Sequence, residues 1–404
     1  MAMPGVPMAD APMPAMTMMD GALGSYTMMQ DASGTAWQPV STPMDGAMWG
    51  SGGWSGMVHG YANLIYDHQS GPRGGDKTFS ESMVMVMAQR HAGPGTLTLK
   101  AMASLDPLMG NDGYPLLLQT GETADGVNHL VDRQHPHNLL MELAGTYAVP
   151  VGQQSSLFIY LGYPGEPALG PATFMHRFSG KDNPAAPISH HWLDSTHITF
   201  GVATAGFVHG PVKVEASVFN GREPDQHRWG WQPLRLDSWS GRITLNPGRD
   251  WSFQVSYGHL HSPEALNPAV NQNRLTASAT YNHAFAGGNW QTTLAFGRND
   301  DRPGTVLNAV LLESAVALRR LTVFARAETV QKDDLVEAPS PLAGRVFRVA
   351  ATTLGAVYDV PVAPHLLLGI GVQATLNVVP APLNVTYGSA TPGGVMPFLR
   401  VKIR

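Results

Sequence analysis

The chain has 404 residues, of which 14% are charged, and its formal net charge at pH 7 is −5. Soluble globular domains usually carry about 25% charged residues, yet no run of about 18 apolar residues predicts a transmembrane helix. The negative charge gives no electrostatic basis for binding nucleic acid, and the lack of cysteine excludes disulfides and thiolate metal sites.

The first 50 residues differ in composition from the rest of the chain. They contain 11 of the 20 methionines, in stretches such as MPAMTMMD and YTMMQ, and few aliphatic residues. No helical or strand period runs through them. The composition therefore predicts a flexible or extended methionine-rich arm over residues 1–50, which we expect on the periplasmic side.

From Trp54 onward, segments of about ten residues alternate apolar and polar side chains. About sixteen such segments occur, near residues 55–67, 80–90, 95–105, 138–149, 155–163, 196–208, 211–220, 237–246, 250–261, 273–284, 288–299, 306–318, 320–330, 345–360, 365–378 and 394–404. This length suits tilted strands that cross a membrane and show one face to lipid. Residues 51–404 are thus predicted to be a single β-barrel domain.

The connections between these segments are alternately short and long, as in outer-membrane barrels with tight periplasmic turns and long external loops. We therefore predict an all-β fold, a transmembrane antiparallel barrel of about 16 strands in the bacterial outer membrane, with outer-membrane lipid around it. A soluble all-β protein would explain the alternation but not the two lengths of connection. The long connection at residues 164–195 resembles, in its placement, the inward-folding constriction loop of sixteen-stranded porins.

The segment SMVMVMAQ shows which face is expected to meet lipid. Glu81 and Gln89 share a face with the methionines and would be costly against hydrocarbon, so Val84 and Val86 are predicted to face outward. The same test on the two neighbouring segments predicts one interior wall. Its soft side chains are Met57, His59, Met83, Met85, Met87 and Met102.

Thioethers are soft, uncharged ligands that suit Cu(I), and imidazole accepts either copper state. For the wall alone, methionine as a flexible space-filler is the simpler interpretation. The wall and the arm together favour a copper ion as the bound metal. The arm would contribute Met16, Met18, Met19, Met28 and Met29.

The arm, through MPAMTMMD and YTMMQ, is similar to the methionine-rich leader of CopB/PcoB-type outer-membrane copper-resistance proteins. This resemblance covers about fifty residues. It implies copper binding on the periplasmic side, a role in copper homeostasis or resistance, periplasmic copper proteins as partners, and no catalysis.

Histidines are frequent in the predicted external loops. DRQHPHN supplies His135 and His137, FMHRFSG supplies Met175 and His176, and ISHHWLDSTH supplies His190, His191 and His197 beside Asp194. Imidazoles with a nearby carboxylate are candidate ligands for Cu(II) or Zn(II), so His190 and His191 join the metal candidates. The alternative is that these histidines form hydrogen bonds within an ordered loop.

Three other functions compete with copper handling. Sixteen strands would leave an aqueous lumen, and a general solute channel could be lined by Lys100, Lys213, Glu215, Arg242, Glu313, Arg326, Glu328, Arg400 and Lys402. An outer-membrane hydrolase would need Ser189 or Ser195 activated by a histidine, but no GxSxG motif occurs and we expect no enzyme. A structural barrel could bind a protein partner through Trp229 and Trp231.

Overall fold

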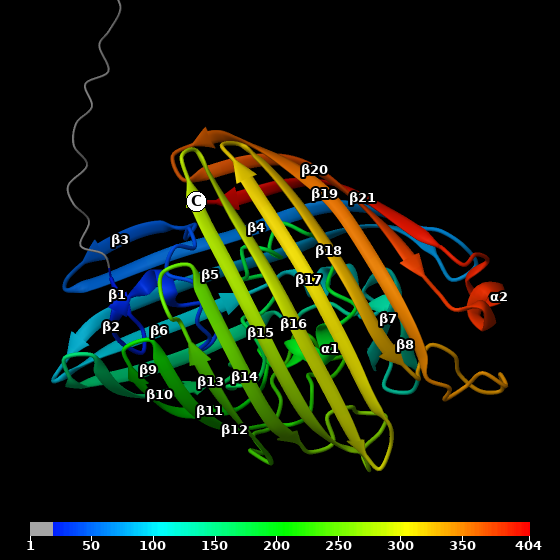
Figure 1. Cartoon of the computed structure of the whole chain (residues 1–404), viewed down its shortest axis with the longest axis horizontal. Helices are drawn as coiled ribbons and strands as arrows, with labels where there is room; N and C mark the ends of the chain where they lie inside the picture. Colours follow the sequence, from blue (N-terminus) through cyan, green and yellow to red (C-terminus); the bar gives the residue numbers. More distant parts are fainter. Residues whose placement is uncertain (1–18) are drawn as a thin grey trace, which may run out of the picture.

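The computed structural model describes residues 19–404. Sixteen antiparallel strands form a closed barrel (Figure 1), in which each strand pairs with the next along the chain and the last pairs with the first. The barrel strands are β4 (Trp54–Gln69), β5 (Gly75–Ala92), β6 (Gly95–Ala103), β9 (Leu140–Gly152), β10 (Ser155–Gly162), β11 (Val202–His209), β12 (Val212–Phe219), β13 (Ser238–Leu245), β14 (Trp251–Leu260), β15 (Asn271–Phe285), β16 (Gly288–Arg302), β17 (Val306–Leu318), β18 (Leu321–Lys332), β19 (Phe347–Ala363), β20 (Leu366–Val378) and β21 (Gly393–Ile403). The predicted barrel and its strand count are confirmed.

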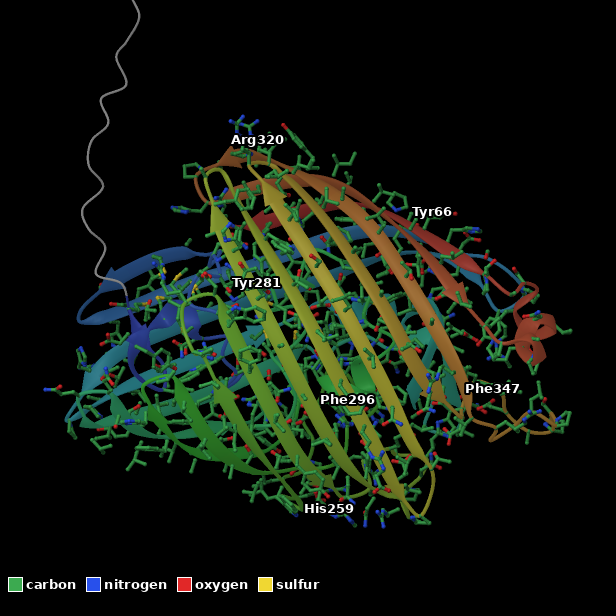
Figure 2. All side chains as sticks on the ribbon, in the orientation of Figure 1. Tyr66, His259, Tyr281, Phe296, Arg320 and Phe347 are labelled. Atoms are coloured by element: carbon green, nitrogen blue, oxygen red, sulfur yellow. The ribbon has the colours of Figure 1, made fainter. Side chains whose placement is uncertain are left out.

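The two ends of the barrel differ in their connections. At the short-turn end, strands such as β5 and β6, or β17 and β18, are joined by two residues, and the short strand β3 (Ala47–Ser51) pairs with the start of β4. The opposite, long-loop end carries the extended connections. Figure 2 shows these two ends through Arg320, in the turn between β17 and β18, and His259, near the end of β14.

The two faces of the sheet are divided as the alternation predicts. Val84 and Val86 on β5 are 43% and 41% exposed, whereas Met83, Met85 and Met87 are 3%, 7% and 4% exposed. Successive side chains of a strand point to opposite faces. The predicted sidedness of β5 is therefore confirmed, with valines outside and methionines inside.

Three segments fold into the lumen. Residues 104–139 carry the small sheet of β7 (Tyr114–Thr123) and β8 (His129–Gln134), with η2 (Asp106–Met109) before it. Residues 163–201 carry α1 (His190–Leu193) and η3 (Ser195–His197) and are almost entirely buried, so the predicted inward-folding loop is present. The third segment is residues 19–46, with β1 (Asp20–Gly21), β2 (Gly24–Thr27) and η1 (Met28–Gln30).

The described part of the predicted arm is packed and not extended. Leu23 and Trp37 are buried within the barrel. The ammonium of Lys100 donates to the carbonyl of Gly34 over 2.9 Å, and Arg242 donates to the hydroxyl of Thr35 over 2.9 Å. The barrel wall thus supplies hydrogen bonds and apolar contacts that no local period in this segment reveals. Met16 and Met18 lie outside the described residues.

Charged side chains expected to line an aqueous lumen are instead buried against these segments. Lys213 and Arg242 each lie 2.9 Å from a carboxylate oxygen of Glu215, and Lys213 is fully buried. The guanidinium of Arg177 in the inward loop lies 2.6 Å from Glu313 on β17. Buried charges are tolerated when they are paired, so these contacts fix the inward segments to the wall.

Two short helical elements lie at the long-loop end, η4 (Ala381–Leu383) and α2 (Asn384–Tyr387), between β20 and β21. No helix within residues 19–404 has both the length and the apolar character needed to cross a membrane.

Candidate functional site

A cavity of about 110 Å³ lies in the lumen toward the short-turn end and is lined by soft side chains from three separate parts of the chain. We call it the methionine cavity. Its lining includes seven methionines and two histidines: Met28, Met44, Met57, Met83, Met85, Met87, Met175, His59 and His176.

The barrel wall contributes its donors through strand register. Met57 on β4 pairs with Met87 on β5, and His59 pairs with Met85. Paired residues in an antiparallel sheet point to the same face. Two adjacent strands therefore present a contiguous patch of sulfur and nitrogen to the lumen.

The N-terminal segment covers this patch. The hydroxyl of Thr27 accepts a hydrogen bond from the backbone N–H of Met29 at the start of η1, a capping contact that fixes the turn. Met19 and Met28 then pack against Met57 and Met87, with Met44 and Met48 at the edge of the same cluster.

The inward loop contributes Met175 and His176. The backbone N–H of His176 donates to the carbonyl of Thr173 over 2.8 Å, and its ring meets that of His59 edge-on, with centroids 5.8 Å apart. The Nε2 atom of His176 is buried and has no hydrogen-bond partner among residues 19–404. Burial, with the charges of His59 and Lys100, lowers the pKa of His176 to about 3. The imidazole is therefore neutral near pH 7 and offers a free lone pair.

Charged side chains form the floor of the cavity nearest the barrel end. The carboxylate of Asp45 accepts from the ammonium groups of Lys181 and Lys402 over 2.7 Å each. Burial alone would raise the pKa of Asp45, but the two positive charges overcome it and hold that pKa well below its usual range. Beside this group, Arg400 pairs with Asp182. The soft donors are thus separated from the short-turn end by a layer of ion pairs.

The predicted metal candidates divide into three groups. Met28, Met57, His59, Met83, Met85 and Met87 line the cavity. Met19 packs in the adjoining cluster, Met102 packs with Met83 and Met85 without lining the cavity, and Met29 is half-buried beside Met28. The sequence drew attention to Met175 and His176 through the loop segment FMHRFSG but did not place them with the wall methionines. It did not single out Met44.

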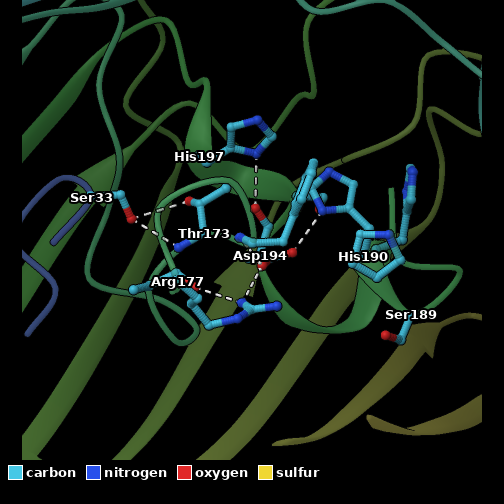
Figure 3. A network of polar contacts seen from close by, with 12 residues as sticks. Ser33, Thr173, Arg177, Ser189, His190, Asp194 and His197 are labelled. Carbon is cyan, nitrogen blue, oxygen red and sulfur yellow. Dashed lines mark hydrogen bonds and ion pairs between the residues drawn. The ribbon is translucent and has the colours of Figure 1, made fainter. Parts of the chain in front are cut away.

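His190 and His191 do not line the methionine cavity. His190 belongs to a network that orders the inward loop (Figure 3): its Nδ1 lies 2.6 Å from one oxygen of Asp194, and Arg177 donates to the other oxygen over 2.7 Å. Nδ1 of His197 lies 2.9 Å from the carbonyl oxygen of Asp194. Burial opposes ionisation of Asp194, but Arg177 and His190 outweigh it and lower its pKa.

The serines considered for a hydrolase have carboxylate partners. Ser189 donates to Glu328 over 2.6 Å, and Ser195 donates to Glu223 over 2.7 Å. Neither hydroxyl bonds to an imidazole among the described residues, so the structure does not assemble a serine–histidine pair in this loop.

Within residues 19–404, no three His, Asp or Glu side chains are grouped so that they could hold a metal ion by themselves. Any metal site near the short-turn end therefore depends on the thioethers. The fit of the methionine cavity to a soft ion rests on its donors and on the unpartnered nitrogen of His176.

No protein-family model matches this chain, and no curated protein matches its sequence. Among solved structures, it is similar to OmpF of Salmonella typhi in complex with daunomycin, with a TM-score of 0.57 and 8% identity over 88% of this chain and 100% of that chain. It is also similar to the outer membrane channel DcaP of Acinetobacter baumannii, with a TM-score of 0.50 and 9% identity over 89% of this chain and 100% of that chain. At these identities the likeness establishes the fold alone, a closed antiparallel β-barrel of the kind these proteins have.

Proposed function

We propose that this protein is a porin-like channel of the bacterial outer membrane whose lumen binds Cu(I). The observation that carries the copper proposal is the convergence of seven thioethers and two imidazoles, from the wall, the N-terminal segment and the inward loop, on one cavity.

The chemistry of the donors supports a soft monovalent ion. Thioethers carry no charge and suit Cu(I), and the neutral imidazole of His176 presents an unpartnered nitrogen at the same place. Methionine as a packing residue is the competing explanation. Packing residues normally leave few voids, whereas these side chains surround a cavity of about 110 Å³. A retained cavity among soft donors favours binding over space-filling.

The position of the cavity supports an exchange with the periplasm. In outer-membrane barrels the short turns face the periplasm, and the methionine cavity lies toward that end of the lumen, lined in part by the N-terminal segment. Periplasmic copper proteins are accordingly the proposed donors or acceptors, and copper homeostasis or resistance is the proposed role. No catalytic step is part of this proposal.

A general solute channel without metal specificity is the second candidate, and the likeness to OmpF and DcaP supports it. Paired charges of the inward segments, such as Arg177 with Glu313, occupy the interior where such a channel would need water. Liposome-swelling rates with neutral sugars separate the two candidates. Rapid swelling that copper does not alter would favour the general channel.

The decisive test of copper binding is a competition titration against a chromogenic Cu(I) chelator, using the full chain in detergent under reducing conditions. Leucine nearly matches methionine in volume, so each substitution should cost less than about 1.5 kcal/mol of stability. We expect Met83→Leu, Met85→Leu and Met87→Leu combined to weaken Cu(I) binding by about 100-fold or more, because three soft ligands are lost together.

The matched control replaces Met102, Met141 and Met396 by leucine. All three are buried but do not line the methionine cavity. This control should bind Cu(I) as the natural chain does. Equal binding by both triple variants would contradict the proposal.

A further inference from the structure

A second, smaller cavity of about 60 Å³ lies at the long-loop end, between the inward loop and the ends of β16 and β17. Its lining carries five carboxylates, from Glu223, Glu264, Asp301, Asp333 and Asp334. We call it the acidic pocket. The one guanidinium in this lining is that of Arg274, which donates to Gln272 and Ser195 and not to any of these carboxylates.

Several of the carboxylates have only neutral partners among the described residues. Asp301 accepts from the amide of Gln272 over 2.9 Å, and Asp333 accepts from the hydroxyl of Thr305 over 2.7 Å. The pocket therefore holds negative charge that a cation would stabilise.

Two buried atoms of the pocket point to a ligand. The Oε2 atom of Glu223 and the Nε2 atom of His191 are both buried and have no hydrogen-bond partner within residues 19–404. The same two side chains approach each other, with Nδ1 of His191 3.6 Å from Oε2 of Glu223. Glu223 is 7% exposed, so its free oxygen is not satisfied by bulk water.

Neighbouring groups hold both side chains in place. Ser195 donates to Oε1 of Glu223, and the carboxyl group of Glu122 packs beside the same side chain. Gly121, with φ +115°, lies against the imidazole of His191, and a Cβ at that position would stand 2.6 Å from Cε1 of the ring. The backbone thus makes room for the imidazole at the wall of the pocket.

We propose that the acidic pocket binds one partly hydrated divalent cation of the Zn(II) type, with His191 and Glu223 as direct ligands. An imidazole nitrogen and a carboxylate oxygen are typical ligands of this ion. Water completes its coordination, because no third His, Asp or Glu in residues 19–404 joins these two in a ready-made cluster. A cavity of about 60 Å³ has room for an ion and several waters. Asp301 and Asp333 balance the charge through that water, and Glu264 adds a carboxyl group that can ionise beside the cation.

This site differs from the methionine cavity in its place in the barrel and in the class of its donors, and it does not depend on the proposed Cu(I) function. The test is isothermal titration of Zn(II) into the metal-free full chain in detergent. We expect one binding event in the natural chain and a loss of affinity of about tenfold or more in Glu223→Gln. Glu264→Gln should weaken binding by a smaller factor, since it removes a carboxyl group that can ionise beside the cation but not a direct ligand.

Two controls separate this site from other effects. Asp225→Asn changes an exposed carboxylate in the same loop as Glu223 and should leave Zn(II) affinity unchanged. The triple leucine variant of Met83, Met85 and Met87 should also bind Zn(II) with the affinity of the natural chain, whether or not its Cu(I) affinity falls. Absence of Zn(II) binding in the natural chain, or equal affinity in the natural chain and both glutamate variants, would overturn the proposal.

The heat-dependent gel mobility of the barrel shows whether Glu223→Gln folds. If it does not fold, the Zn(II) affinity of Glu264→Gln tests the site instead. Glu264 is half-buried in a surface loop, so its substitution should not disturb folding. A lower Zn(II) affinity in this variant supports the site, and an unchanged affinity counts against it.

Discussion

The methionine cavity and the acidic pocket lie toward opposite ends of one lumen and are built in opposite ways. The cavity takes five of its nine soft donors from β4 and β5, where strand register places them. The pocket takes its two unpartnered donors, His191 and Glu223, from connecting loops. Strands align similar side chains by their period of two, whereas loops bring together residues that are distant in the chain. The barrel thereby separates neutral sulfur donors from charged oxygen donors.

The largest effect is expected from a substitution in the inward loop, residues 163–201, which contributes to both sites. Arg177 lies 2.6 Å from Glu313 and 2.7 Å from Asp194, and all three side chains are buried. Removal of one partner from a buried ion pair typically costs about 3–5 kcal/mol. We expect Arg177→Met to lower the free energy of unfolding in urea by that amount and to weaken both Cu(I) and Zn(II) binding.

The matched control for this change is Arg302→Met. Arg302 lies 2.6 Å from Asp300, but its side chain is 66% exposed. Exposed pairs contribute about 1 kcal/mol or less, so this variant should unfold nearly as the natural chain does. Equal losses in the two variants would mean that the buried network does not hold the inward loop.

The next effect concerns the contact between the inward loop and the N-terminal segment. Glu166 accepts from the hydroxyls of Ser33 and Thr173 over 3.1 Å each, beside the Ser33–Thr173 contact drawn in Figure 3. Burial raises the pKa of Glu166 to about 7. The folded protein therefore keeps this proton more tightly than the unfolded chain does. Its contribution to stability is complete below about pH 4.5 and is lost as the pH rises to 7.

Glutamine at position 166 cannot lose a proton, so Glu166→Gln should be free of this loss. The stability of the variant relative to the natural chain should rise by up to about 3 kcal/mol between pH 4.5 and pH 8. Urea unfolding at the two pH values measures the difference. A relative stability that does not change with pH would show that Glu166 ionises normally in the fold.

The smallest of the three effects is confined to one end of the barrel. His176→Gln removes one nitrogen donor from the methionine cavity and leaves the acidic pocket intact. We expect Cu(I) affinity to fall about tenfold, equivalent to about 1.4 kcal/mol, with no change in Zn(II) affinity. The exposed His227→Asn serves as the control. A fall in Zn(II) affinity as large as that in Cu(I) affinity would show that the two sites are not separate.

The sequence predicted the parts of this structure that follow from period and composition. Alternation located the sixteen strands. Glu81 and Gln89 share a strand face with Met83, Met85 and Met87, which placed these methionines inside the barrel. The placement of the long connection at residues 164–195 indicated that it folds into the barrel. Each of these features depends on neighbours in sequence or on strand pairing, which a single chain reveals.

Features that depend on contacts between distant segments were not predicted. The N-terminal segment was expected to be flexible or extended, yet Leu23 and Trp37 are buried because the barrel interior supplies their partners. The alternative of a solute channel placed Lys213 and Glu215 beside open water, but they form a buried ion pair under the inward segments. The segment FMHRFSG drew attention to Met175 and His176. Their place beside Met44 and the barrel wall depends on where the loop and the N-terminal segment meet that wall, which no local pattern reveals.

X-ray absorption at the copper edge of the Cu(I)-loaded full chain tests the central claim most directly. We expect a first coordination shell dominated by sulfur, which is lost or replaced in the Met83, Met85 and Met87 leucine variant and retained in the Met102, Met141 and Met396 variant. A shell of nitrogen and oxygen alone, or the same spectrum from both variants, would contradict it.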